Sequence, residues 1–229
     1  MISLNNIEEL NNRIITCRTC PRLVEWRESV AATKRRQYMD WDYWGKPVPG
    51  FGDQDAGLLL VGLAPAAHGA NRTGRMFTGD QSGNWLYGAL FKFGFANQPE
   101  STGRNDGMQL KNCYITAAVR CAPPANKPAK DEFDNCRPFL LQEMQLLKNV
   151  KVIVALGKIA FDTVVTCTES LQWSNFPRKP SFKHGQQVKI HENLYLVASY
   201  HPSQQNTFTG KLTKRMFHSV FKRAATVLK

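Results

Sequence analysis

Four cysteines are spaced as the ligands of a metal site or a cluster would be. Cys17 and Cys20 form a C-x2-C pair, and Cys121 and Cys136 flank a proline-rich loop that leads into a helix. Four thiolates can hold a zinc ion or an iron–sulfur cluster, and this spacing alone does not separate the two. Cys121 and Cys136 could instead be small buried residues, as we expect for the two remaining cysteines. A site built from all four would staple the N-terminal segment to the body of the domain.

Polar residues gather directly after apolar segments that we expect to be strands. His68 follows the first such segment, Asn126 the second and His201 the last. In open parallel sheets, ligands bind beyond the carboxyl ends of the strands. The sequence therefore predicts a binding site at one edge of a sheet, built from the loops 64–69, 121–127, 157–158 and 201–203.

The elements that must position these loops follow from hydrophobic patterning. Four short, β-branched apolar runs are typical of strands buried on both faces, at residues 58–63, 114–120, 150–156 and 194–200. Helical periodicity lies between or after them, at residues 83–93, 132–147, 158–166 and 212–228. This order predicts an α/β fold with a parallel sheet covered by helices, whereas residues 21–57 and 167–193 are expected to be irregular.

The charge balance favours a polyanionic partner. There are 30 Lys and Arg residues against 18 Asp and Glu, a formal net charge of +12. Such a field attracts nucleic acid, although a merely solvated basic surface is the alternative. An anionic membrane is disfavoured, because no segment pairs a basic face with an exposed apolar one. The longest apolar run is about half of the ~20 residues that a spanning helix needs, so we expect one soluble cytoplasmic domain, residues 1–229.

A long motif after the first expected strand resembles a known enzyme family. Residues 62–80 read GLAPAAHGANRTGRMFTGD. The later segments TAAVRCAPP (116–124), NCRPFL (135–140), ALGK (155–158) and SYHPS (199–203) agree with it in order. Together they resemble the family 5, or B-type, uracil-DNA glycosylases, the iron–sulfur branch of the uracil-DNA glycosylase superfamily. The resemblance covers nearly the whole chain.

The resemblance implies a three-layer α/β sandwich around a central four-stranded parallel sheet. It also implies a 4Fe-4S cluster held by Cys17, Cys20, Cys121 and Cys136, and so decides between cluster and zinc. The partner would be DNA that contains uracil or other deaminated bases, and the enzyme would flip out the damaged nucleotide before cutting its N-glycosidic bond. Such a protein would associate with the nucleoid, and we expect a monomer.

Three residues are the expected catalytic groups. Negative charge develops on the leaving base and positive charge on the sugar, so catalysis needs an anion-stabilising donor and a group that positions water. His201 could place a ring nitrogen near uracil O2, unless it is structural. The family's FTGD segment assigns water positioning or cation stabilisation to Asp80, which could equally be the N-cap of the next helix. Asn126 offers the donor and acceptor that a uracil edge requires, or it is an ordinary turn residue.

The remaining candidates would bind the base or the DNA. The expected base-binding residues are Ala64, His68, Gly69, Phe77 and Asn126, and the expected DNA-binding residues are Ser203, Phe208 and Lys211. The family match assigns Phe77 to stacking on the flipped base, with a buried loop anchor as the alternative. Phe208 is the only large apolar residue available as a wedge that fills the gap in the duplex. Lys211 would contact phosphates.

Two alanines separate this sequence from better-known uracil-DNA glycosylases. Ala66 stands where other branches carry an acidic or amide residue, which leaves the water activator open, and Ala117 stands where several carry a base-reading Asn. Without that fixed amide the pocket rejects wrong bases less strongly, so we expect release of hypoxanthine as well as uracil. The alternatives are a strictly uracil-specific family 4 enzyme, a non-catalytic iron–sulfur nucleic-acid-binding protein and a zinc-stapled nucleotide-binding module.

Overall fold

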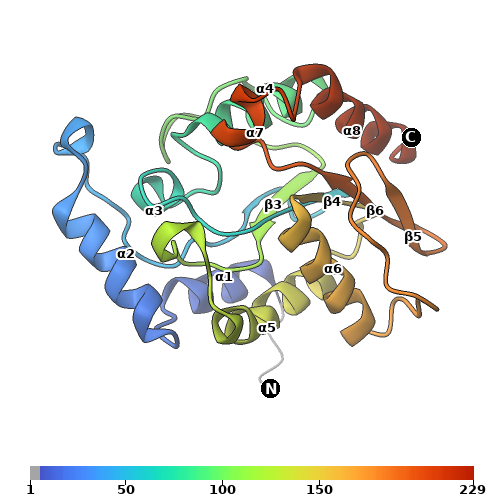
Figure 1. The fold of residues 1–229 in the computed structure, drawn as a ribbon, viewed down its shortest axis with the longest axis horizontal. Helices are drawn as coiled ribbons and strands as arrows, with labels where there is room; N and C mark the ends of the chain where they lie inside the picture. The colour runs from blue at the N-terminus through green and yellow to red at the C-terminus, as the bar shows by residue number, and fades with distance from the viewer. Residues whose placement is uncertain (1–5) are drawn as a thin grey trace.

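The computed structural model describes residues 6–229, built around one sheet with the strand order β1-β3-β2-β4-β6-β5 (Figure 1). Its four central strands are β3 (Cys113–Ala117), β2 (Leu58–Gly62), β4 (Val152–Leu156) and β6 (Leu194–Ser199). Neighbouring members of this set are parallel. Every residue of β2, β3 and β4 is buried, which explains why these strands are continuous apolar runs in the sequence.

Two short antiparallel strands extend the sheet, so the expected four-stranded sheet has six strands. At one edge β1 (Phe51–Gly52) pairs with β3, and at the other β5 (Gln187–His191) pairs with β6. Both lie in stretches that we expected to be irregular. Neither carries an apolar run, because β1 has only two residues and β5 is an exposed edge with one buried residue.

Helices cover both faces of the sheet, which confirms the three-layer sandwich. On one face lie α4 (Gln81–Lys92) and α8 (Lys214–Val227), and on the other lie α1 (Ile7–Ile15), α5 (Lys130–Leu146) and α6 (Lys158–Ser170) (Figure 1). Strand β2 divides its side chains between two cores. Leu58 and Leu60 pack toward the α4 and α8 side, and Leu59 and Val61 pack toward the α5 and α6 side.

The expected helices all occur, and α1 and α2 near the N-terminus are two further helices that we did not expect. The stretch expected to be irregular begins with α2 (Pro21–Thr33), in which Leu23, Val24, Arg27 and Val30 are buried. A buried arginine in this narrow stripe masks its helical periodicity in the sequence. The shorter elements are the 3-10 turns η1 (Arg36–Tyr38) and η2 (Pro124–Asn126) and the helices α3 (Ala70–Thr73) and α7 (Gln204–Phe208). Within residues 6–229, no helix is both long and apolar enough to cross a membrane.

Candidate active site

A cleft of about 810 Å³ opens beyond the carboxyl ends of the parallel strands. Its lining comes from the loops after β2 and β6, the start of α4 and the turn η2, so segments more than 100 residues apart meet there. All the expected catalytic and base-binding residues line it, together with one expected DNA-binding residue: Ala64, His68, Gly69, Phe77, Asp80, Asn126, His201 and Ser203. Phe208 and Lys211 lie outside it.

Phe77 reaches the cleft through an unusual backbone conformation. Its φ is +55°, in the left-handed region that a bulky residue rarely adopts. Its ring lies against Gly62 at the end of β2, where a Cβ atom would stand 2.9 Å from the ring carbon Cζ. The ring is half-buried, and its centroid lies 5.9 Å from that of the His201 imidazole, at an angle of 31°. An aromatic face is therefore held beside His201 in the cleft.

Asp80 is both the N-cap of α4 and a residue of the cleft. Its Oδ1 accepts a hydrogen bond of 2.9 Å from the backbone N–H of Gly83. Its Oδ2 packs against Gly69, where a Cβ atom would stand only 2.3 Å away. Burial raises the pKa of the Asp80 carboxyl, and the amides of Gly83 and Ser82 oppose this rise. The capping interpretation thus holds for one oxygen and leaves the other available for chemistry.

His201 follows β6 and stays uncharged at neutral pH. Burial lowers the pKa of its imidazole to about 4. Its backbone carbonyl accepts a hydrogen bond of 2.9 Å from the Asn206 carboxamide, which fixes the loop at the start of α7. A neutral ring can donate one N–H to an anion without first losing or gaining a proton.

Asn126 and Ser203 close the cleft from opposite loops. Asn126 is exposed, lies in the tight turn η2 and, like Ala125 before it, has a positive φ. The Ser203 hydroxyl caps α7 by accepting a hydrogen bond of 3.3 Å from the Asn206 N–H. Phe208, at the end of α7, is 74% exposed, and the Lys211 ammonium lies 5.1 Å from the centroid of the Tyr200 ring.

The four cysteines expected to bind a cluster line one small cavity, between the start of α2, the end of β3 and α5. The Arg27 guanidinium donates to Cys121 Sγ at 3.0 Å, and the Asn135 carboxamide donates to Cys20 Sγ at 3.5 Å. Such donors suit sulfur atoms that carry negative charge. Among residues 6–229 no three His, Cys, Asp or Glu side chains converge closely enough to hold a single metal ion. Four cysteine sulfurs beside one cavity are the kind of ligand set that a thiolate-bound metal or cluster uses.

Comparison with known proteins decides the family. Residues 49–225 match the model of the uracil DNA glycosylase superfamily. The chain belongs to this superfamily. It is 51% identical to a "Type-5 uracil-DNA glycosylase" of Mycobacterium leprae over 96% of this chain and 94% of the relative. It is 48% identical to one of Thermus thermophilus, over 92% and 93% respectively.

Within the superfamily, this glycosylase chain groups with the type-5 members. A "Type-4 uracil-DNA glycosylase" of Pyrobaculum aerophilum is only 30% identical, over 68% of this chain and 62% of the relative. A type-5 protein of the same organism is 44% identical over 95% of this chain. The resemblance to family 5 is thereby confirmed, and the family 4 alternative is disfavoured.

Several residues of the glycosylase cleft carry no motif and are missing from the sequence-based predictions. Tyr43 is buried, and its hydroxyl lies 3.1 Å from Nδ1 of His68, which holds that ring in the cleft wall. Burial lowers the pKa of His68, and the charges of Arg35 and Arg72 lower it further, so this ring is also neutral. Arg35, Gln37 and Tyr38 form another part of the wall. They lie about 25 residues before the first motif, in a stretch without periodicity.

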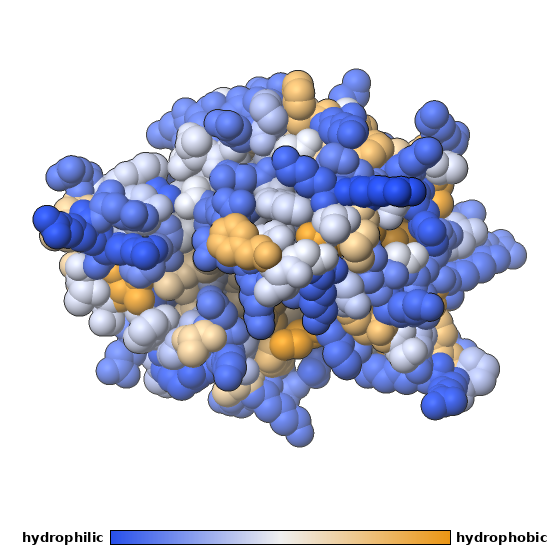
Figure 2. All heavy atoms as spheres, turned by 45° about the horizontal axis from the view of Figure 1, so that its top comes forward, coloured by the Kyte–Doolittle hydropathy of each residue, from blue (hydrophilic) through white to orange (hydrophobic). Residues whose placement is uncertain are grey.

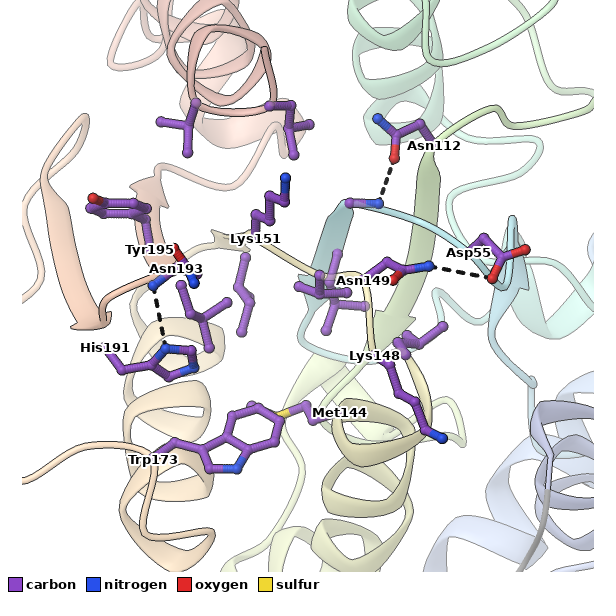
Figure 3. Close-up of a pocket in the computed structure, with 18 of the residues that line it drawn as sticks. Asp55, Asn112, Met144, Lys148, Asn149, Lys151, Trp173, His191, Asn193 and Tyr195 are labelled. Carbon is purple, nitrogen blue, oxygen red and sulfur yellow. Dashed lines mark hydrogen bonds between the residues drawn. The ribbon is translucent and has the colours of Figure 1, made fainter.

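A second cavity, of about 950 Å³, lies at the opposite end of the sheet and holds none of the predicted site residues (Figure 3). Two of its asparagines have hydrogen-bond partners within the chain. The Asn112 carboxamide accepts from Gly57 N–H at 2.5 Å, and the Asn149 carboxamide donates to Asp55 at 3.4 Å. Lys148 and Lys151 are exposed on its rim.

Proposed function

We propose that this protein initiates base excision repair by hydrolysing the N-glycosidic bond of uracil in DNA. One observation carries the proposal: a single cleft brings a neutral imidazole, a carboxylate, an aromatic face and an amide around the same space. The type-5 relatives, named uracil-DNA glycosylases, support the same activity. The face with α4, α7 and α8 is mostly hydrophilic, with scattered hydrophobic residues (Figure 2). Helix α8 exposes Lys214, Arg215, Lys222 and Arg223, and such basic residues attract a polyanion.

In this mechanism the residues act on a flipped nucleotide. Phe77 would stack on the base, and Asn126 would pair with its exposed edge. Neutral His201 would donate its N–H to the oxygen on which negative charge grows as the glycosidic bond breaks. Asp80 Oδ2 would position the attacking water or stabilise the cationic sugar. Since His201 donates as a neutral group, the base would leave as an anion and would not first need a proton from the protein.

The pocket should accept more than uracil. Ala64, Ala66 and Ala67 line the cleft, so this part of its wall offers only methyl groups and backbone to the base. Ala117 at the end of β3 is buried and supplies no fixed amide. A pocket without such a group leaves no buried polar atom unpaired when a different base enters. We therefore expect the enzyme to release hypoxanthine as well as uracil. Base release is measured on a set of duplexes that each contain one damaged base, and release of uracil alone would refute this expectation.

We also propose that the cysteine cavity holds a 4Fe-4S cluster through Cys17, Cys20, Cys121 and Cys136. The group would tie α2, β3 and α5 together and supply no step of base release. Iron and acid-labile sulfide should each approach about four atoms per chain after anaerobic purification, because this is the composition of the cluster. A colourless protein with stoichiometric zinc would overturn this assignment.

The test of the catalytic proposal is base release from a uracil-containing duplex. The wild type should release uracil, and Asp80→Ala, Asn126→Ala and His201→Ala should each slow release while the protein stays folded and brown. If the wild type binds such DNA but releases no base, the non-catalytic nucleic-acid-binding alternative is the better one.

We also propose that the protein is a monomer, and gel filtration with light scattering tests this.

A further inference from the structure

Residues 34–41, called the arm here, form one wall of the cleft although they carry no motif. The arm follows α2, which ends at the C-cap Lys34, where φ is +53°. Arg35, Gln37 and Tyr38 line the cleft, across from the start of α7. The arm and α7 are therefore two separate surfaces beside the same opening.

A buried arginine of α3 holds the arm in place. The Arg72 guanidinium lies between the rings of Tyr38 and Trp41, at 4.0 and 3.9 Å from their centroids. Its Nε donates to the carbonyl of His68 at 2.8 Å, and its Nη2 donates to the carbonyl of Gly79 at 3.1 Å. One side chain, 2% exposed, thus connects the arm with two of the three loops that carry the expected base-binding residues. The arm is anchored to the site and is not a free loop.

The tip of the arm presents charge without a partner. Arg35 and Arg36 are exposed, and neither side chain makes an ion pair or hydrogen bond with any of residues 6–229. Met39, 55% exposed, stands beside them. Two free guanidiniums at the rim of a nucleotide-sized cleft complement the phosphates that flank a flipped nucleotide, because guanidinium and phosphate match in charge and geometry.

We propose that the arm is a second DNA-binding surface, in which Arg35 and Arg36 bind backbone phosphates next to the nucleotide in the cleft. This inference rests on the proposed function and deepens it. The α7 side would contact the DNA from one side of the flipped nucleotide and the arm from the other. Arg72 is then a positioning residue, since it touches the arm and the loops but does not line the cleft.

The decisive experiment compares two variants that each lose two positive charges. Arg35→Gln/Arg36→Gln alters the arm, and Lys148→Gln/Lys151→Gln alters the opposite end of the sheet. Affinity for a uracil-free duplex is measured at several salt concentrations, and base release is measured at saturating uracil-containing DNA. The arm variant should bind several-fold more weakly, with a slope of log affinity against log salt lower by about 1 to 2, because each lost phosphate contact removes about one unit. Its rate at saturating DNA should fall by a smaller factor than its affinity, because the arm is proposed to act on binding.

Equal weakening of both variants would overturn the inference, because the effect would then reflect net charge. A lower rate at saturation with unchanged affinity would also overturn it, since the arginines would then act on the chemical step. If the wild type binds DNA but releases no base, the proposed function fails. The affinity comparison still decides whether the arm binds DNA.

Discussion

The two carboxylate oxygens of Asp80 have different neighbours, which allows its capping and catalytic roles to be separated. Asn caps helices about as well as Asp, so Asp80→Asn should keep the bond to Gly83 and change the free energy of unfolding by less than about 0.5 kcal/mol. Base release should fall by about 10²–10⁴-fold, because the negative charge is lost. Urea unfolding and single-turnover kinetics measure the two effects. An unchanged rate would leave Asp80 with the capping role alone.

The position of the Asp80 carboxylate requires a glycine at residue 69. A methyl group there would stand 2.3 Å from Asp80 Oδ2 and 3.2 Å from the Ala66 methyl carbon, so Gly69→Ala should displace the carboxylate and slow base release at least tenfold. Gly88→Ala is the matched control, because its Cβ would meet nothing closer than 4.0 Å on the surface of α4. The control should keep full activity and gain up to about 1 kcal/mol of stability. A similar rate in both variants would contradict this role of Gly69.

The low pKa of His201 predicts an unusual pH dependence. With a pKa of about 4, the ring stays neutral down to mildly acidic pH, so protonation of His201 should not slow release between pH 8 and 5. The charged imidazolium dominates only below its own pKa. A fall in the rate of base release below about pH 6.5, the ordinary pKa of histidine, would refute this if the fall is absent in His201→Gln. A fall in rate at acidic pH that persists in His201→Gln is caused by another group. Asp80 is the first candidate, because the pKa of its carboxyl is raised.

At the scale of elements, β3 and α5 are joined by a buried charge network. Glu143 of α5 is fully buried and accepts hydrogen bonds from Arg120, just after β3, and from Thr116 at 2.7 Å. Arg120 directly precedes Cys121, and α5 contains Cys136, so the network also fixes the spacing of these two cysteines. Strand and helix are therefore coupled by charge as well as by apolar packing.

Removing one member of this network should lower the free energy of unfolding. Glu143→Ala leaves the Arg120 guanidinium buried and unpaired, so it should lower the free energy of unfolding by about 3–5 kcal/mol. Asp162→Ala is the control, because its pair with Lys158 lies on the exposed surface of α6 and should contribute less than about 0.5 kcal/mol. The loss of stability in each variant is measured as the shift of its urea unfolding midpoint from that of the wild type. Similar midpoints would show that the buried network does not stabilise the fold.

At the scale of the molecule, the cysteine cavity connects parts that are distant in sequence. Cys17 and Cys20 belong to the N-terminal segment, whereas Cys121 and Cys136 belong to the sheet layer and the helix beneath it. A group bound by all four closes a loop of about 100 residues, and such cross-links stabilise a fold chiefly by restricting the unfolded chain. If this group is the proposed iron–sulfur cluster, oxidative removal of its iron should lower the melting temperature by several degrees. An unchanged melting temperature after complete iron loss would contradict this stapling role.

Much of the fold could be predicted because its signals are local. Strands β2, β3, β4 and β6 are apolar runs, and their parallel arrangement follows from the helices between them. The edge strands could not be predicted, since an exposed strand needs no apolar run. Helix α2 was not predicted because its buried stripe includes Arg27, whose charge hides the periodicity. The partners of this guanidinium include the distant Cys121 Sγ, which the local sequence does not reveal.

For the site, the sequence predicted a group of residues that follow strand ends, because motif residues and strand patterns are short-range features. The structure places these residues in one cleft, and their roles and the cluster stay predictions. Tertiary contacts alone show that Asp80 uses one oxygen as a cap and presses the other against Gly69, and that Arg72 joins the arm to the cleft loops. Burial in the folded chain also lowers the pKa of His201 to about 4. Burial and contact depend on distances between segments far apart in the chain, which no local pattern of residues records.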